Sequence, residues 1–294
     1  MKDYSLVLDS SCSETKEFVE KNGHFFVPFN INYEGKDYLD GINIKVEQIK
    51  EKIDNGIFGK TGIIDIPSIQ KIFDKALKVS RKVIAISLSK NLSGMCNAFR
   101  LAANEDKYKD KIIVIDSLLH TPFSSNIFRY AITQEGKKET AESLTEKIKK
   151  QNEHAVAILA LKDIKFLAAS GRISPSIAKI GAIVGIQPTM IFENGIVDKK
   201  KVIKARNAKK SITKSVEYIN DYVNNNNLDK NKWYIGIGQT QVDIARQSIY
   251  KWAKDSTDME VRYEEQSELH GVCIVHVGYN INVVSLFYKY ENNK

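Results

Sequence analysis

The sequence predicts an α/β protein of two domains, and three observations lead to this fold class. The chain has 294 residues, 43% of them hydrophobic, which is enough for one large or two ordinary domains. Strand-like and helix-like patterns alternate through the first half, which predicts a mostly parallel sheet with flanking helices. The second half adds a hairpin signal, which predicts a mixed sheet with helices. We place the boundary near residue 150, giving domains 1–150 and 151–294.

The first half supplies strands and helices in turn. Strands are expected where apolar and β-branched residues run together, at 4–11, 82–89 and 111–117. A strand pair is expected over 24–41, with its turn at Glu34–Gly35. Helices are expected where apolar residues recur at helical spacing between capping residues. These segments are 13–23, 45–56, 67–80, 94–106, a segment ending near 134, and 139–154.

The second half mixes the same elements with a hairpin. Asn194–Gly195 is a strong turn signal inside the hairpin expected over 186–205. The segment 163–185 is expected to be mainly helical, with an interruption near Ser170–Gly171. The other helices are expected at 208–226 and 242–255. The other strands are expected at 155–161, 232–239, 273–278 and 282–290.

Charge and cysteine content narrow the class of protein. The net charge is +8 and the pI is about 9.1, which fits an acidic partner, an anionic membrane, nucleic acid or a solvated lysine-rich surface. Cys12, Cys96 and Cys273 lie far apart without a CxxC motif, so neither a disulfide framework nor a zinc site is expected. Because signal-peptide and membrane-spanning patterns are both absent from the sequence, we expect a soluble, cytoplasmic protein.

Hydroxyl groups cluster where three predicted strands end. The sequences "LVLDSS", "AISLSKNLSG" and "VIDS" each run from an apolar strand to the start of a helix. Ligands bind outside the carboxyl ends of strands in open parallel sheets, and a helix start offers free N–H donors. The three ends therefore suit a small anion. The alternative is that these serines and aspartates only cap helices.

Several common motifs are missing from the sequence. Neither a dinucleotide-binding G-x-G-x-x-G after a strand nor a phosphate-binding G-x-x-x-x-G-K-[ST] occurs, so a nucleotide is not favoured. The nucleophile motif G-x-S-x-G is also missing. The five histidines show no metal-binding spacing, so we expect neither a metal nor a cofactor.

Nine blocks together resemble the DegV family of fatty-acid-binding proteins, and the resemblance runs nearly end to end. In chain order the blocks are "LDSSCS", "VPFNINYEGKDYLDGINI", "KTGIIDIPS", "SLSKNLSGM", "VIDS", "FLAASGRIS", "GIQPTMIFENG", "KARNAKK" and "GVCIVHVG". The resemblance implies two α/β domains with a lipid tunnel between them. It also implies a carrier that presents the carboxylate of a long-chain fatty acid to a fatty acid kinase catalytic subunit. Such a carrier is not an enzyme on its own.

The resemblance also assigns roles to individual residues. The family's carboxylate-binding threonine, serine and histidine match Thr61, Ser93 and His276. Arg206 in "KARNAKK" is expected to face the kinase, and the basic surface allows a transient contact with an anionic membrane. Neighbours of the pocket are expected to be Gly94, Ser10, Gly278 and Arg172.

Two blocks depart from the family pattern. "TGIIDIPS" stands where a TSQPSP-like block is usual, and "HVGYN" stands where an HTGPG-like block is usual. The first departure removes a hydroxyl and an amide that follow the threonine. Both departures bear on the mouth of the pocket and on the preferred chain length.

Two other functions remain open from the residues. A stand-alone phosphotransferase or hydrolase would use Asp9, Ser10, Ser93 and His276, although no sequence spacing ties these groups together. A nucleic-acid binder would use the basic run "DKKKVIKARNAKK". That run lacks the interleaved aromatic residues of a single-strand platform, so we expect no nucleic-acid partner.

Overall fold

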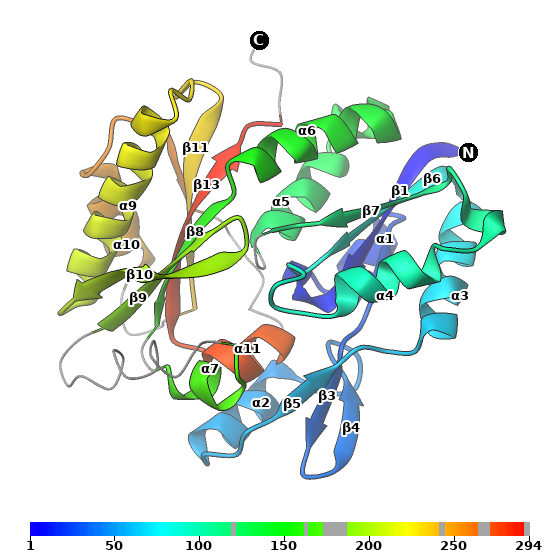
Figure 1. Ribbon diagram of the computed structural model, residues 1–294, viewed down its shortest axis with the longest axis horizontal. Helices are drawn as coiled ribbons and strands as arrows, with labels where there is room; N and C mark the ends of the chain where they lie inside the picture. Colours follow the sequence, from blue (N-terminus) through cyan, green and yellow to red (C-terminus); the bar gives the residue numbers. More distant parts are fainter. Residues whose placement is uncertain (119–121, 162–163, 173–186, 241–244, 264–270, 291–294) are drawn as a thin grey trace. The chain divides into compact units, whose positions relative to one another are not determined.

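The computed structural model describes residues 1–118, 122–161, 164–172, 187–240, 245–263 and 271–290 (Figure 1). The chain divides into two compact units. Unit 1 consists mainly of Met1–Asn152 with Gln266–Val275, and unit 2 mainly of Glu153–Glu265 with His276–Asn292. Each unit combines a sheet with helices, which confirms the predicted fold class. The boundary near residue 150 stays our prediction for the domains.

Unit 1 is built on a four-stranded parallel sheet. Its order is β2 (Phe25–Val27), β1 (Lys2–Asp9), β6 (Ser80–Ser87) and β7 (Ile112–Asp116). Every neighbouring pair is parallel. The carboxyl ends of all four strands therefore lie along one edge, as the alternating sequence pattern predicts.

Helices cover both faces of this sheet. α3 (Ile66–Leu77) and α4 (Met95–Ala102) share one hydrophobic core with Val7 and Ala85. On the face of Tyr4 and Leu6, Phe128 of α5 (Pro122–Ala131) packs edge-on against His24, with ring centres 5.6 Å apart. α1 (Lys16–Lys21) and α6 (Ala141–Glu153) are two further predicted helices of unit 1.

A small antiparallel sheet follows the first strands. Its order is β4 (Lys36–Leu39), β3 (Asn30–Tyr33) and β5 (Lys60–Gly62), and α2 (Val46–Asp54) lies between β4 and β5 in the chain. Glu34 and Gly35 have φ of 52° and 84°, the left-handed conformation that a tight hairpin turn requires. The predicted strand pair around this turn is confirmed.

Unit 2 contains a six-stranded mixed sheet. Among its described strands, only β11 and β12 pair in parallel, and the other neighbours are antiparallel. Asn194 and Gly195, with φ of 50° and 75°, form the predicted hairpin turn between β9 and β10. The sheet order is β10 (Ile196–Ala205), β9 (Gln187–Glu193), β8 (Val156–Leu161), β13 (Ile281–Tyr288), β11 (Trp233–Gln239) and β12 (Val261–Tyr263).

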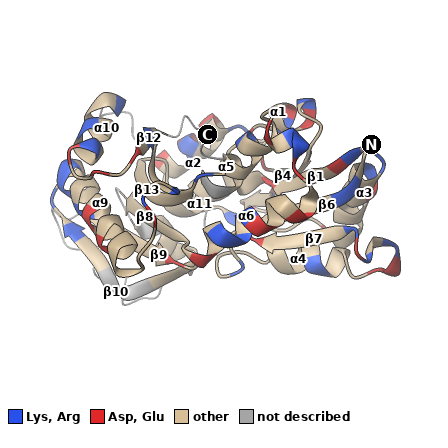
Figure 2. Cartoon of the chain, turned by 90° about the horizontal axis from the view of Figure 1, so that it is seen from above, with Lys and Arg blue, Asp and Glu red and all other residues tan. Residues whose placement is uncertain are grey.

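Two helices cover one face of the mixed sheet. α9 (Ala208–Asn225) and α10 (Arg246–Lys254) pack their apolar side chains into one core with the strands. On α9, Lys residues precede Glu217 and Asp221, whereas the charged residues within α10 are all basic (Figure 2). α7 (Lys165–Ala169) lies inside the segment predicted as mainly helical, and residues 173–185 of that prediction lie outside the described residues.

The prediction of a strand at 273–278 is wrong, because α11 (Gly271–Val277) is helical. The β-branched run "GVCIVHV" favours a strand by propensity. Tertiary packing overrides this preference, since Val272 joins the core of unit 1 and its N–H donates to the Asp40 carboxylate over 3.1 Å. A Cβ on Gly271 would lie 2.2 Å from Ile49 Cδ1, so glycine permits the close approach of α11 to α2.

Candidate functional site

Asp9 ends β1 and connects it to the end of β6. Its Oδ1 accepts hydrogen bonds from the N–H and the hydroxyl of Ser11, at 3.0 Å and 2.5 Å. Its Oδ2 accepts from Leu88 N–H over 2.7 Å. Only 1% of Asp9 is exposed, and this burial raises the pKa of its carboxyl to about 6 despite the hydrogen bonds that lower it. The carboxylate therefore serves to hold two strand ends together.

Ser10 is tied into a second buried network. Its hydroxyl donates to Asp40 Oδ2 over 2.6 Å and accepts from Phe29 N–H over 3.2 Å. Asp40 Oδ2 also accepts from Val272 N–H. The single hydrogen of the Ser10 hydroxyl is thus directed to Asp40. Ser10 as a neighbour of the pocket stays a prediction.

Ser93 lies just before α4, and part of the hydrogen-bonding capacity of its hydroxyl is already occupied. The backbone N–H of Ser93 donates to Ser89 O over 3.0 Å, which folds the loop back on itself. Ser93 Oγ accepts from Met95 N–H over 3.2 Å. A hydroxyl that accepts in this way still has its own hydrogen to donate. Gly94, which follows, is exposed, and a Cβ there would meet nothing within 4 Å.

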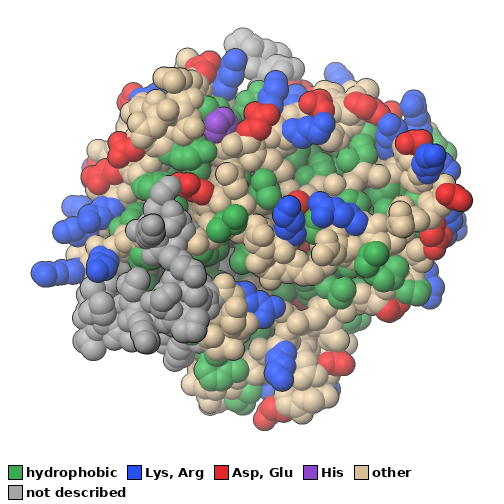
Figure 3. Space-filling view, in the orientation of Figure 1, with side chains coloured by type: hydrophobic (Ala, Val, Ile, Leu, Met, Phe, Trp, Pro, Cys, Tyr) green, Lys and Arg blue, Asp and Glu red, His purple; other side chains and the backbone are tan. Residues whose placement is uncertain are grey.

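Thr61 lies on β5, one of the two edge strands of the small sheet. It pairs with Ile31 of β3 and is half-buried. Two large apolar side chains nearby in the chain reach the surface, with Phe58 51% and Ile63 42% exposed. On the face drawn in Figure 3, apolar side chains reach the surface in small groups separated by polar and charged ones. Thr61 and Ser93 both belong to unit 1. Thr61 lies in the small antiparallel sheet, whereas Ser93 precedes α4, which packs on the four-stranded sheet.

His276 lies in the last turn of α11, in the part of the chain grouped with unit 2. Burial, and then the positive charge of Arg172, lowers the pKa of His276 to about 4. The imidazole is therefore neutral at neutral pH. Arg172 is exposed, and its guanidinium donates to Ser170 O over 2.7 Å. Gly278 has φ of 74°, the left-handed conformation that commonly ends a helix.

Arg206 lies on the surface of unit 2, between β10 and α9. It is exposed, as are Lys209 and Lys210 in the first turn of α9. Asn207 caps that helix by accepting from Lys210 N–H over 2.9 Å. The basic block predicted from the sequence thus presents three cations at one helix start. Its role toward a partner stays a prediction.

Sequence reasoning missed Asp40 and the helix that it caps. Asp40 precedes Gly41 in "YLDG", a pattern that indicates an exposed turn. The carboxylate is instead 1% exposed. No local signal could have revealed its partner Val272, which lies more than two hundred residues later in the chain.

The described residues include neither a candidate metal site nor a membrane-spanning helix. Within the part of the chain that the structure describes, no three His, Cys, Asp or Glu side chains are grouped so that they could hold a metal ion. None of the helices described is both long enough and apolar enough to cross a membrane.

Sequence comparisons identify relatives along most of the chain. A family model described as an uncharacterised protein of the DegV family matches residues 4–290. A DegV domain-containing protein of Caldanaerobacter subterraneus is 28% identical over 82% of this chain and 83% of its own length. One from Clostridium perfringens is 29% identical over 74% of this chain and 77% of its own length.

Solved structures share the fold over nearly the whole chain. A stearic acid-binding protein from Eubacterium ventriosum has a TM-score of 0.82 and 22% identity, covering 98% of this chain and 99% of its own. A DegV family protein from Thermus thermophilus, described by its fatty acid binding, has a TM-score of 0.80 and 18% identity, covering 98% and 100%. DegV from Bacillus subtilis, described as a fatty acid binding protein, has a TM-score of 0.73 and 19% identity, covering 98% and 100%.

Proposed function

The chain belongs to the DegV family, and from this premise we propose that it binds a long-chain fatty acid. The carboxylate is held by Thr61, Ser93 and His276, and the acyl chain enters the apolar tunnel that the family resemblance implies. The fatty acid binding described for the structurally similar proteins supports this assignment. The fatty acid is the bound ligand in this proposal, no cofactor is required, and the protein acts as a carrier.

The donor geometry at Ser93 carries the proposal. Its oxygen accepts from Met95 N–H, so its hydrogen is available for a carboxylate at the start of α4. A hydrogen bond to a charged group contributes about 1.5–3 kcal/mol, and the helix end adds about 0.3–1 kcal/mol. The exposed, unobstructed Gly94 leaves room for a head group beside the hydroxyl.

His276 contributes a neutral donor in this proposal. Its lowered pKa means that the imidazole donates a hydrogen bond to the carboxylate without forming an ion pair. The pKa of His276 is about 4, so its imidazole stays neutral between pH 6 and 8. The affinity for fatty acid should therefore change little with the protonation of His276 over that range.

The acyl chain supplies most of the affinity. At about 0.8 kcal/mol per buried CH₂, fourteen methylenes contribute roughly 11 kcal/mol before the costs of binding. This exceeds the contribution expected from the head group. The polar residues therefore set the orientation of the lipid, and orientation is what a carrier needs in order to present a carboxylate.

The test is the affinity of Ser93→Ala for a fatty acid, measured by competition with a fluorescent fatty acid. The substitution should weaken binding by about 10- to 150-fold and still leave measurable binding. Ser68→Ala is the matched control, because it removes a hydroxyl at the start of α3 that donates to Asp65 over 2.8 Å. Unchanged affinity in Ser93→Ala would remove Ser93 from the site.

A fatty acid kinase catalytic subunit is the proposed partner. Exposed Arg206 would contact it, so Arg206→Ala should retain lipid and slow phosphorylation of the bound fatty acid in a reconstituted assay. Lys251→Ala, which removes an exposed cation of α10, is the control. Loss of lipid from Arg206→Ala would instead place Arg206 in the pocket or the fold. Turnover of an acyl or phosphoryl substrate by the chain alone would favour the enzyme alternative.

A further inference from the structure

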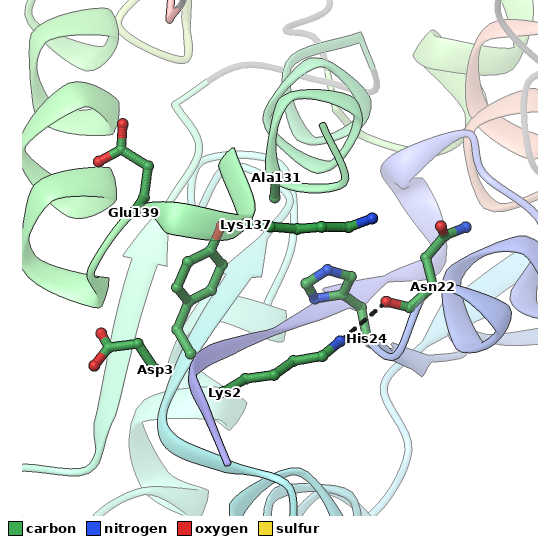
Figure 4. Close-up of a pocket in the computed structure, with 8 residues that line it drawn as sticks. Lys2, Asp3, Asn22, His24, Ala131, Lys137 and Glu139 are labelled. Carbon is green, nitrogen blue, oxygen red and sulfur yellow. Dashed lines mark hydrogen bonds between the residues drawn. The ribbon is translucent and has the colours of Figure 1, made fainter. Parts of the chain in front are cut away.

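We propose that Lys2, His24 and Lys137 form a second binding site, which takes a small phosphate-bearing anion at the amino-terminal end of β1. These residues line a cavity of about 270 Å³ within unit 1 (Figure 4). They come from three segments: β1, the residue before β2, and the short 3₁₀ helix Gly136–Lys138. This site is at the opposite end of β1 from Asp9.

Lys2 is held in place by the backbone. Its ammonium donates to Asn22 O over 3.2 Å and to Gly23 O over 3.4 Å. An ammonium group has three hydrogens, so one is left for a ligand. A Cβ on Gly23 would lie 2.4 Å from Lys2 Nζ, and Gly23 also has φ of 74°. The glycine therefore allows the ammonium to approach the chain closely and fixes one donor at the cavity.

His24 supplies a neutral donor. Its Nδ1 accepts from Leu6 N–H over 2.9 Å, so the neutral ring carries its proton on Nε2. The side chain is 5% exposed and packs against Phe128. Burial, and then the charges of Lys2 and Lys137, lowers the pKa of His24 to about 3, which keeps the ring neutral. Figure 4 shows the ring between the side chains of Lys2 and Lys137.

The two carboxylates that line the cavity are engaged elsewhere. Asp3 Oδ2 accepts from Ala141 N–H over 2.7 Å. Glu139 Oε1 accepts from the Tyr130 hydroxyl over 2.7 Å and pairs with Lys147 Nζ at 2.5 Å. In Figure 4 both acids lie on the side of the cavity away from His24.

Lys137 provides the free charge of this site. Among the described residues, no carboxylate forms an ion pair with it, whereas Lys147 nearby in the chain is paired with Glu139. The His24 side of the cavity therefore carries two ammonium groups and one imidazole N–H, with hydrogens that no described residue accepts. Such a set of donors is complementary to an anion.

Size and donor number indicate the class of anion. The cavity is smaller than the roughly 300–1,000 Å³ of pockets that hold drug-sized ligands, so the ligand is small. Three donors from three segments match the three acceptor oxygens of a phosphate group better than the two oxygens of a carboxylate. Lysine ammonium groups commonly bind phosphate as point charges. The ligand is either inorganic phosphate or a small phosphate monoester.

The test uses the full chain with free and esterified phosphate as probes. Calorimetry measures the affinity for inorganic phosphate and for glycerol phosphate at constant ionic strength, with chloride and acetate as controls. NMR signals of the His24 ring report whether binding is local. The matched variants are Lys137→Gln and Lys138→Gln, because Lys138 is an exposed neighbour that does not line the cavity.

We expect saturable binding of a phosphate probe that shifts the NMR signals of the His24 ring. Lys137→Gln should weaken it by about tenfold or more, and Lys138→Gln should leave it nearly unchanged. Tighter binding of glycerol phosphate than of inorganic phosphate would identify an esterified ligand, and the reverse would identify free phosphate. Equal binding of acetate, equal effects of the two variants, or no saturation would overturn the proposal.

Discussion

The two ends of the four-stranded sheet in unit 1 use polar and charged groups in opposite ways. At the carboxyl end, Asp9 and Asp40 accept hydrogen bonds from backbone N–H groups and serine hydroxyls, and they join segments that are far apart in the chain. At the amino end, Lys2 donates to carbonyls and lies with His24 and Lys137 around a cavity. Acids therefore stabilise the fold at one end, and cations remain available for a ligand at the other.

The largest loss of stability is expected when Asp40, which accepts hydrogen bonds from the Ser10 hydroxyl and Val272 N–H, is replaced. Asp40→Ala leaves the buried Ser10 hydroxyl and Val272 N–H without their acceptor, at a cost of about 1–3 kcal/mol for each. The free energy of unfolding should fall by about 3 kcal/mol in urea titrations. Asp37→Ala, on the exposed part of the same hairpin, should change it by less than about 1 kcal/mol. Equal losses of unfolding free energy in the two variants would show that these hydrogen bonds of Asp40 do not stabilise the fold.

A smaller loss is expected when the approach of α11 is obstructed. In Gly271→Ala the new Cβ would lie 2.2 Å from Ile49 Cδ1 and 2.7 Å from Asp40 Oδ1, so α11 or α2 must shift. The expected loss in unfolding free energy is about 2 kcal/mol. Gly62→Ala is the control, because its Cβ would lie 3.8 Å from Asn30 Cβ, an ordinary contact. A stable Gly271→Ala protein would show that α11 packs less closely than described.

The two ends should also respond oppositely to pH. The raised pKa of Asp9, about 6 against 3.8, means that the folded state holds a proton that the unfolded state has lost. This term makes the unfolding free energy decrease as pH rises from about 4 to about 6. The lowered pKa of His24, about 3 against 6.5, makes it increase over the same range, because the unfolded state takes up the proton.

Two variants separate these contributions. Asp9→Asn should make the stability profile rise more steeply with pH between about 4 and 6, and His24→Gln should make it rise less. Urea titrations at a series of pH values measure both slopes. Profiles that stay parallel to that of the unmodified protein would show that neither group is shifted as described.

The smallest effect on stability is expected at Ser93. Its hydroxyl accepts one hydrogen bond from Met95 N–H at a partly exposed helix start, so Ser93→Ala should cost at most about 1 kcal/mol. The same substitution should affect fatty acid affinity more strongly. A loss of stability as large as that of Asp40→Ala would mean that Ser93 maintains the fold and that its effect on the ligand is indirect.

The sequence predicts elements that depend on neighbouring residues. The alternation of strands and helices identifies the parallel sheet, and Asn194–Gly195 identifies the hairpin of unit 2, because periodicity and turn chemistry are local. The helix α11 could not be predicted in this way, because its conformation depends on Asp40 and on the space at Gly271. Strand β12 is not predicted from the sequence either, because a strand of three residues is too short to show an alternating pattern.

In the candidate site, too, some features could be predicted from the sequence, and others depend on contacts between distant segments. The family blocks predict Thr61, Ser93 and His276 as carboxylate-binding residues, but they do not show which hydrogens are free to donate. The commitment of Ser10 to Asp40, and the free hydrogen of Ser93, depend on contacts between segments. Lys2, His24 and Lys137 carry no motif at all, because their placement around one cavity arises only from the fold.

Native mass spectrometry of the purified chain, followed by extraction and identification of any ligand, tests the central claim most directly. We expect one long-chain fatty acid per chain, which is either retained through purification or bound when fatty acid is added in solution. A folded chain that carries no lipid and refuses added fatty acid would contradict it, and would show that the altered "TGIID" and "HVGYN" blocks accompany a different ligand.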